Sequence, residues 1–375
     1  DTVGKAGLEQ YYETYLRGKN GEQKFYIDNV GRISEIISST DSVAGDDLYL
    51  SIDADLQKAT YLALQNEIAA IVYSNIKSGE IPINDVYTAL IGNSVINTEH
   101  FSKAKASDTE KNVLSVFKSR QKTTLGKIKQ ELTSSPEALN TMSDEVLDEF
   151  TYIISMLKDD QVLLKNEIDT SDSVYQKWKN QKISPKEYLS YCITQHWIDI
   201  SQLNVDEKYA DSTEVYDALC KYILKNIKTD TEFSKIIYQY MITRGEISPR
   251  QLCLILFDQG VLDYDDATVN KLKNGSLSPR DFLMKKIYNI EITPAQLALE
   301  PCIGSCVVTD EKTGEIRAMV SYPGYDSNKL ANGVDSEYFA SLQHDKSSPL
   351  LNYATQQKTA PGSTFKLVSA TAGLV

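Results

Sequence analysis

Four helix starts marked by proline divide the middle of this sequence, and they constrain its fold more than any other feature. At each one, a serine or threonine directly precedes a proline, and an acidic or amide residue stands three positions after the serine or threonine. The hydroxyl can cap a helix, and proline is tolerated at the first helical position, where an N–H has no intrahelical partner. A Glu or Gln at the last position adds the pattern of a capping box. The four segments are Ser184–Glu187, Ser248–Gln251, Ser278–Asp281 and Thr293–Gln296.

Apolar residues recur at helical spacing in the same region, from Val146 to Leu157 and again from Val215 to Ile227. The intervals between the helix starts are unequal, so we do not expect a solenoid. We predict one helical region over residues 79–297, without a catalytic constellation of its own. Several of the 23 tyrosines fall at its apolar positions. We favour a core-filling role for them over a docking face for carbohydrate or protein.

Strand patterns flank the helical region. Residues 304–310 and 315–321 predict a hairpin around a turn at Lys312–Gly314. Upstream, apolar and polar side chains alternate over residues 48–52 and predict another strand, after which Asp53 can cap a helix. The chain is therefore expected to combine helices and strands in an α+β fold.

Length and charge narrow the functional classes. A chain of 375 residues exceeds one typical core, so two or three domains are expected. The net charge of −13 argues against nucleic acid as a partner, since no basic stripe is present to neutralise phosphates. It also disfavours binding to an anionic membrane surface through a cluster of basic residues. No apolar run reaches the length of a membrane span, and no signal peptide is recognised.

The cysteines and histidines do not predict a metal or cofactor site. The five cysteines show no zinc-type spacing, and we expect most of them to be buried free thiols: Cys192, Cys220, Cys253, Cys302 and Cys306. The three histidines are scattered along the chain. His196, beside Trp197, is expected to be a packed helix residue and not a ligand.

Ser363 and Lys366 form the clearest chemical motif. Pro361–Gly362 is a turn signal directly before an apolar, helix-compatible run. Residues three apart share one helix face, and a serine at a helix start faces free N–H groups and the positive end of the helix dipole. This favours an activated serine nucleophile, with Lys366 as the proton acceptor. An isolated S-x-x-K is more often a capping serine followed by a solvated lysine, so the surrounding sequence matters.

That surrounding sequence resembles the class B penicillin-binding proteins. Pro361–Lys366 is similar to their nucleophile motif, and the hairpin followed by Pro323–Asn328 is similar to the first strands of their transpeptidase domain. Near the start, Gly7–Gly21, Gly31–Ile33 and Gly45–Gln57 resemble their non-catalytic pedestal. The resemblance, to the subset with a large helical insertion, implies three parts. They are a pedestal of the dimerisation type over residues 1–78, the insertion over 79–297, and the first strands and nucleophile helix of a transpeptidase domain over 298–375.

The resemblance also implies a reaction. Ser363 would attack the D-alanyl-D-alanine end of a peptidoglycan stem peptide, D-alanine would leave, and a neighbouring stem amine would take the acyl group. Lys366 must be neutral to accept the serine proton, which desolvation and a nearby cation would favour. The Ser363 backbone N–H would be one oxyanion donor. β-Lactams would acylate the same hydroxyl. The family works at the extracytoplasmic face of the bacterial membrane, anchored by an N-terminal helix absent from this chain.

The sequence departs from the family pattern at three places. Lys312–Gly314 spells the K-T-G of the third active-site motif, but it precedes Ser363 and occupies a turn, so we interpret it as turn chemistry. No S-x-N or K-T-G follows Lys366. We therefore expect these 375 residues to be catalytically silent on their own, whereas the parent protein would be a transpeptidase. Tyr353 stands where the family commonly has an arginine, in an Asn-Arg-Ala triplet.

One alternative stays open. The pedestal and insertion could form a non-catalytic scaffold that recruits cell-wall assembly proteins. A β-lactam sensor, a β-lactamase or a D,D-carboxypeptidase would share the serine and lysine, but none of them accounts for the pedestal-like residues 7–57.

Overall fold

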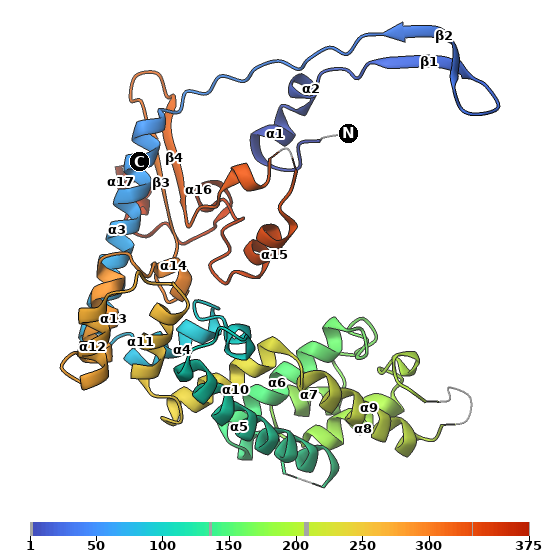
Figure 1. Ribbon diagram of the computed structural model, residues 1–375, viewed down its shortest axis with the longest axis vertical. Helices are drawn as coiled ribbons and strands as arrows, with labels where there is room; N and C mark the ends of the chain where they lie inside the picture. Colours follow the sequence, from blue (N-terminus) through green and yellow to red (C-terminus); the bar gives the residue numbers. More distant parts are fainter. Residues whose placement is uncertain (1–2, 135–136, 206–209, 332, 375) are drawn as a thin grey trace. The chain divides into compact units, whose positions relative to one another are not determined.

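The computed structural model describes residues 3–134, 137–205, 210–331 and 333–374 (Figure 1). Helices predominate, and each of the two sheets has two strands, so the α+β fold class with a helical insertion is confirmed. The chain separates into two compact units. One contains Asp1–Ala59 with Val307–Met319, and the other contains Thr60–Cys306 with Val320–Val375.

The smaller unit begins with two short helices and an exposed β-ribbon. After α1 (Gly7–Tyr11) and α2 (Glu13–Leu16), strands β1 (Glu22–Ile27) and β2 (Ile33–Thr40) pair antiparallel, with two register shifts. Asp28 forms the turn between them, because its carboxylate accepts hydrogen bonds from the backbone N–H groups of Val30 and Arg32 at 2.9 Å.

The strand predicted over residues 48–52 is wrong. A strand needs a neighbouring strand to pair its backbone N–H and C=O groups. Residues 48–52 pair with neither of the two described sheets, so they do not form a strand. At the end of the segment, the Ser51 hydroxyl donates to the Ile316 carbonyl at 2.8 Å. The predicted cap is confirmed: the Asp53 carboxylate accepts from Leu56 N at 3.0 Å, and α3 (Ala54–Ser78) follows. In the first turn of α3, the Gln57 amide exchanges two hydrogen bonds with the Met319 backbone, at 2.6 and 2.7 Å.

The predicted hairpin is confirmed as β3 (Gly304–Thr309) and β4 (Ile316–Tyr322). Asp310 organises its turn by accepting hydrogen bonds from Lys312 N at 2.8 Å and Thr313 N at 3.0 Å. Gly314 follows at a φ of +75°, a conformation that glycine adopts without steric cost. The K-T-G triplet therefore forms the turn of this hairpin, as its position in the sequence predicted.

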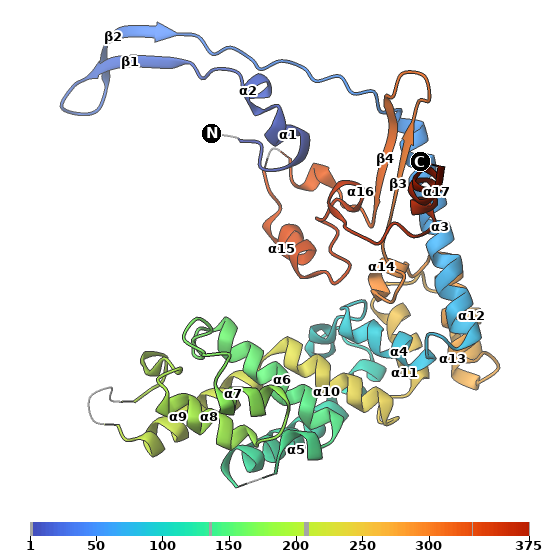
Figure 2. The same ribbon diagram turned by 180° about the vertical axis from the view of Figure 1, so that it is seen from behind.

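The larger unit is mostly helical (Figures 1 and 2). Helices α6 and α9 confirm the two apolar periodicities predicted from the sequence. The helices between α3 and β3 are α4 (Ile83–Gly92), α5 (Asp108–Thr133), α6 (Asp144–Asp159), α7 (Ser173–Lys179), α8 (Pro185–Thr194), α9 (Ser212–Ile227), α10 (Thr231–Thr243), α11 (Pro249–Asp258), α12 (Asp266–Asn274), α13 (Pro279–Tyr288) and α14 (Pro294–Leu297), with 3₁₀ turns η1 (Thr98–Ser102), η2 (Leu139–Thr141) and η3 (Ile200–Gln202). After β4 come η4 (Ser327–Lys329), α15 (Ser336–His344), α16 (Tyr353–Gln356), η5 (Gly362–Phe365) and α17 (Lys366–Leu374).

All four proline-marked starts begin helices, namely α8, α11, α13 and α14. Reciprocal capping boxes form at Ser248 and Thr293, where the third residue is glutamine. At Ser184 the hydroxyl accepts from Glu187 N at 3.1 Å, without the return bond of a box. Proline at the first position and a capping hydroxyl are sufficient to begin this helix.

One continuous apolar core fills the helical region, and tyrosines contribute to it as predicted. Tyr238 is buried, with its ring stacked on Phe117 at 4.2 Å between centroids. At the rim, tyrosine hydroxyls donate to aspartates from other helices or turns: Tyr152 to Asp230, Tyr191 to Asp172, Tyr222 to Asp160, and Tyr240 to Asp148. Tyr152, Tyr191 and Tyr222 pack their rings against the core and keep a polar tip at its edge.

The cysteine prediction is confirmed, whereas the histidine prediction is wrong. All five cysteines are free, and all but Cys306 are buried. His196 lies past the end of α8, exposed, at a φ of +58°. It occupies the left-handed turn that lets Trp197 fold back, where Trp197 N donates to the Cys192 carbonyl at 2.9 Å. Across the described residues, no helix has both the length and the apolarity to cross a membrane.

Candidate active site

Ser363 and Lys366 lie in consecutive elements at the end of the described chain. Ser363 is in the 3₁₀ turn η5, and Lys366 is the first residue of α17. Gly362 enters the turn at a φ of +55°. Three 3₁₀ residues complete one turn with a rise of about 6 Å, so side chains at i and i+3 eclipse one another. The Lys366 backbone N–H also donates to the Ser363 carbonyl. The structure thus brings the two residues together on one side of a single turn.

The structure argues against a simple capping role for Ser363. Pro361 occupies the N-cap of the turn, and no side chain makes a capping hydrogen bond there. The neighbouring Thr364 hydroxyl instead donates to the Pro361 carbonyl. Because the turn is stabilised without it, the Ser363 hydroxyl is not required for the local structure.

Both side chains of the candidate pair are exposed, and so are the other residues of η5 and α17. Leu367, for example, is 78% exposed although it is apolar. A neutral lysine requires desolvation, and the described residues leave Lys366 in water. The turn alone positions Ser363 and Lys366. The described residues do not bury the Lys366 amine, as its role as a neutral proton acceptor would require.

Tyr353, which replaces the arginine common in the resembled family, is a packing residue. Its ring is buried, and its hydroxyl donates to the Ser347 carbonyl at 2.7 Å. Its backbone N–H donates to the Ser321 hydroxyl at 3.0 Å, which ties α16 to the end of β4. Tyr353 therefore anchors the segment that leads to the Ser363 turn.

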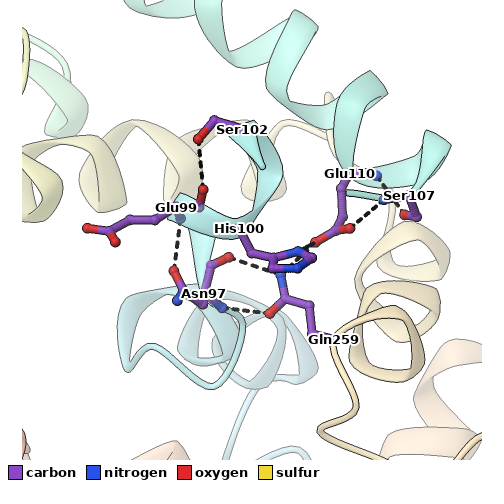
Figure 3. A network of polar contacts seen from close by, with 7 residues as sticks. All are labelled: Asn97, Glu99, His100, Ser102, Ser107, Glu110 and Gln259. Atoms are coloured by element: carbon purple, nitrogen blue, oxygen red, sulfur yellow. Dashed lines mark hydrogen bonds and ion pairs between the residues drawn. The ribbon is translucent and has the colours of Figure 1, made fainter. Parts of the chain in front are cut away.

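A buried polar network lies apart from this motif, at the start of α5 (Figure 3). The Glu110 carboxylate accepts hydrogen bonds from Ser107 N at 2.7 Å and Gln259 Nε2 at 2.8 Å, and it lies 2.7 Å from His100 Nδ1. Burial raises the pKa of Glu110, but these hydrogen bonds outweigh burial and hold the pKa below its usual value. The Ser107 hydroxyl accepts from Glu110 N, so it serves as a cap and not as a nucleophile. The network joins η1, α5 and the end of α11 structurally.

A second polar cluster was not predicted from the sequence. The buried Glu145 accepts from Arg120 at 2.7 and 2.9 Å, and it pairs with Arg244 at 2.6 Å. Glu149 lies one turn further along α6 and is only 2% exposed. Burial, followed by the charge of Glu145, raises the pKa of Glu149 to about 8.

Glu149 should make the stability of this chain fall as pH rises. Its folded-state pKa of about 8 exceeds its ordinary value of 4.5. Between pH 4.5 and pH 8, the folded state therefore binds more protons than the unfolded state. At about 1.4 kcal/mol per pKa unit, unfolding should become easier by roughly 3 kcal/mol between pH 5 and pH 8. Glu149→Gln should remove most of this slope in urea titrations at each pH. An unchanged slope would contradict the prediction.

No group of three or more His, Cys, Asp or Glu side chains in the described part of the chain could hold a metal ion.

Comparison with known proteins gives matches at both ends of the chain. The family model of the penicillin-binding protein transpeptidase domain matches residues 304–375, and that of the penicillin-binding protein dimerisation domain matches residues 1–50. No solved structure is significantly similar to the chain.

Curated relatives agree with these matches. The peptidoglycan D,D-transpeptidase PbpA of Mycolicibacterium smegmatis is 44% identical over 77 residues, which are 20% of this chain and 16% of PbpA. The peptidoglycan D,D-transpeptidase MrdA of Salmonella typhimurium is 34% identical over 79 residues, or 21% of this chain and 13% of MrdA. The peptidoglycan D,D-transpeptidase FtsI of Escherichia coli is 34% identical over 114 residues, or 30% and 19%. The chain thus spans less than a fifth of each of these relatives.

Proposed function

This chain belongs to the class B penicillin-binding proteins, and we propose that the full-length protein is a serine D,D-transpeptidase that cross-links peptidoglycan stem peptides. One observation carries the proposal: within the segment that matches the transpeptidase domain, Ser363 and Lys366 occupy one turn whose structure does not use the serine hydroxyl. Ser363 is the proposed nucleophile and Lys366 the proposed general base.

The proposed reaction has two halves. In the first, the Ser363 hydroxyl attacks the carbonyl between the two terminal D-alanines, Lys366 takes its proton, and D-alanine leaves with a proton. In the second, the amine of a neighbouring stem peptide attacks the acyl-enzyme, and Ser363 regains its proton. The Ser363 backbone N–H, in the first turn of the helical segment, is a proposed donor to the developing oxyanion. A β-lactam would acylate the same hydroxyl through its strained amide.

The three-part organisation belongs to the same proposal. Residues 1–78 form the pedestal, residues 79–297 the insertion, and residues 298–375 the start of the transpeptidase domain. We place the protein at the extracytoplasmic face of the bacterial membrane, held by an N-terminal helix outside this chain. No cofactor takes part.

A docking role for the insertion is the second candidate. It is favoured by a specific observation: the helical region has its own apolar core, yet it lies between the two segments that the family models match. Cell-wall assembly proteins would be its partners. Deleting residues 79–297 from the full-length protein should then abolish their co-purification and preserve acylation by β-lactam. Partners that still co-purify would contradict the docking role.

The transpeptidase proposal is tested by the products of the full-length protein. With peptidoglycan ending in D-alanyl-D-alanine, mass spectrometry should detect cross-linked stem peptides and released D-alanine. Ser363→Ala should abolish both products. Ser369→Ala, at an exposed hydroxyl on α17, is the matched control and should retain both. Cross-links formed by Ser363→Ala would refute the assignment.

A further inference from the structure

A cleft at the C-terminal end of α3 combines positive charge with two tyrosine rings. Its volume is about 490 Å³, and α13 forms its other wall. Tyr73 and Lys77 of α3 face Arg280, Met284, Lys285 and Tyr288 of α13 across it. All of these residues belong to the larger compact unit. The proposed transpeptidase chemistry uses none of them.

The charge of this cleft is opposite to that of the chain. Over residues 271–286 five basic side chains accompany one acid, Asp281, although the whole chain carries a net charge of −13. Three cations line the cleft together with this one carboxylate. The Asp281 carboxylate is already engaged, because it accepts from the Ser278 hydroxyl at 2.7 Å and lies 3.9 Å from Arg280. The cleft therefore retains a net charge of about +2.

The cationic groups are available to a ligand. The guanidinium of Arg280 is held in place by donating to the Ile76 carbonyl at 3.2 Å, yet the side chain remains 42% exposed. Its remaining N–H groups form a fork suited to phosphate or carboxylate oxygens. Lys77 and Lys285 are exposed, and neither forms a salt bridge to another described residue.

Two aromatic rings complete the cleft. The ring centroids of Tyr73 and Tyr288 lie 5.2 Å apart, and Tyr288 is 58% exposed. Met284, which also lines the cleft, is buried and apolar. A cleft with an apolar floor, aromatic sides and a few convergent polar groups is typical of a small-molecule site. The rings offer a surface for a ligand ring, and the cations offer a position for its acidic group.

We propose that this cleft binds a phosphorylated sugar. The phosphate would sit among Lys77, Arg280 and Lys285, and the sugar ring would lie against Tyr288 and Tyr73. Charge decides in favour of phosphate over carboxylate. A phosphate monoester carries roughly −1.5 to −2 near neutral pH and balances the cleft, whereas a carboxylate would leave one positive charge unmatched.

The test is calorimetric titration of this chain with N-acetylglucosamine 6-phosphate, N-acetylglucosamine and inorganic phosphate. The sugar phosphate should bind at least about tenfold more tightly than either of the other two, because only it engages both rings and cations. Tyr288→Leu should weaken the sugar phosphate and leave inorganic phosphate unchanged. Failure of the sugar phosphate to bind, or equal binding of inorganic phosphate, would overturn the proposal.

A charge-matched pair of variants separates the cleft from the surrounding basic surface. Lys285→Gln removes a lining cation, whereas Lys273→Gln removes an exposed cation of the same basic stretch that does not line the cleft. Lys285→Gln should weaken sugar phosphate binding by about tenfold, and Lys273→Gln should have little effect. Equal weakening by the two variants would show diffuse attraction and contradict a defined site. Both side chains are exposed, so both variants should keep the helical circular dichroism of the parent chain.

Discussion

Lys366→Met in the full-length protein should slow acylation by benzylpenicillin about 10²- to 10⁴-fold, the range that a positioned general base contributes. Methionine keeps the length of the side chain and removes the amine, so Ser363 would lose its proton acceptor while the turn keeps its backbone. The rate is measured by quenching the reaction at set times and determining the fraction of acyl-enzyme by intact-protein mass spectrometry.

Lys358→Met is the control for this experiment. Lys358 is an exposed lysine shortly before the turn, and its replacement removes the same charge. It should acylate at the parental rate. If Lys366→Met acylates as fast as Lys358→Met, then Lys366 is not the base.

Arg120→Met should destabilise the larger unit by about 1.5–3 kcal/mol, because the buried Glu145 carboxylate loses both hydrogen bonds from Arg120 Nη2. Arg244 would remain 2.6 Å from Glu145 and would still compensate part of its charge, which keeps the loss below that of a fully unpaired buried carboxylate. The free energy of unfolding is measured in urea at pH 7. Lys118→Met, an exposed position on the same helix, should cost less than about 0.5 kcal/mol.

A double variant tests the cause of this loss. When Glu145→Gln is added to Arg120→Met, the buried carboxylate that lost its Arg120 hydrogen bonds is replaced by a neutral amide, and stability should recover in part. If the double variant loses the sum of the two single effects, the interaction between the two side chains has no measurable energy and this account of the cluster is wrong.

Local features of this fold could be predicted from the sequence. The helices at Pro185, Pro249, Pro279 and Pro294 begin where expected, because a cap and its first turn involve only four consecutive residues. The turn at Lys312–Gly314 was predictable for the same reason. The pairing of Ser363 with Lys366 in one turn also follows from spacing alone.

Features that join distant residues could not be predicted. The strand expected over residues 48–52 depended on a partner strand that the fold does not provide. The sequence contains the Ser107–Glu110 capping pattern, but nothing in it shows that Gln259 completes the network. The cluster of Arg120, Glu145 and Arg244 likewise joins three separate helices or helix ends. The prediction for His196 was wrong because this residue lies past the end of α8 and adopts the left-handed conformation, with a φ of +58°.

The candidate site shows the same division. Sequence and structure agree that Ser363 and Lys366 lie in one turn, within the segment that the transpeptidase family model matches. What would desolvate Lys366 depends on residues distant in sequence, which neither the local motif nor the exposed turn reveals.

The most direct measurement of the central claim is to locate the benzylpenicillin adduct in the full-length protein by digestion and tandem mass spectrometry. We predict a single penicilloyl ester on the peptide that contains Pro361–Lys366, on the Ser363 oxygen, and no adduct in Ser363→Ala. A stoichiometric adduct on another residue, or one that persists in Ser363→Ala, would contradict the account.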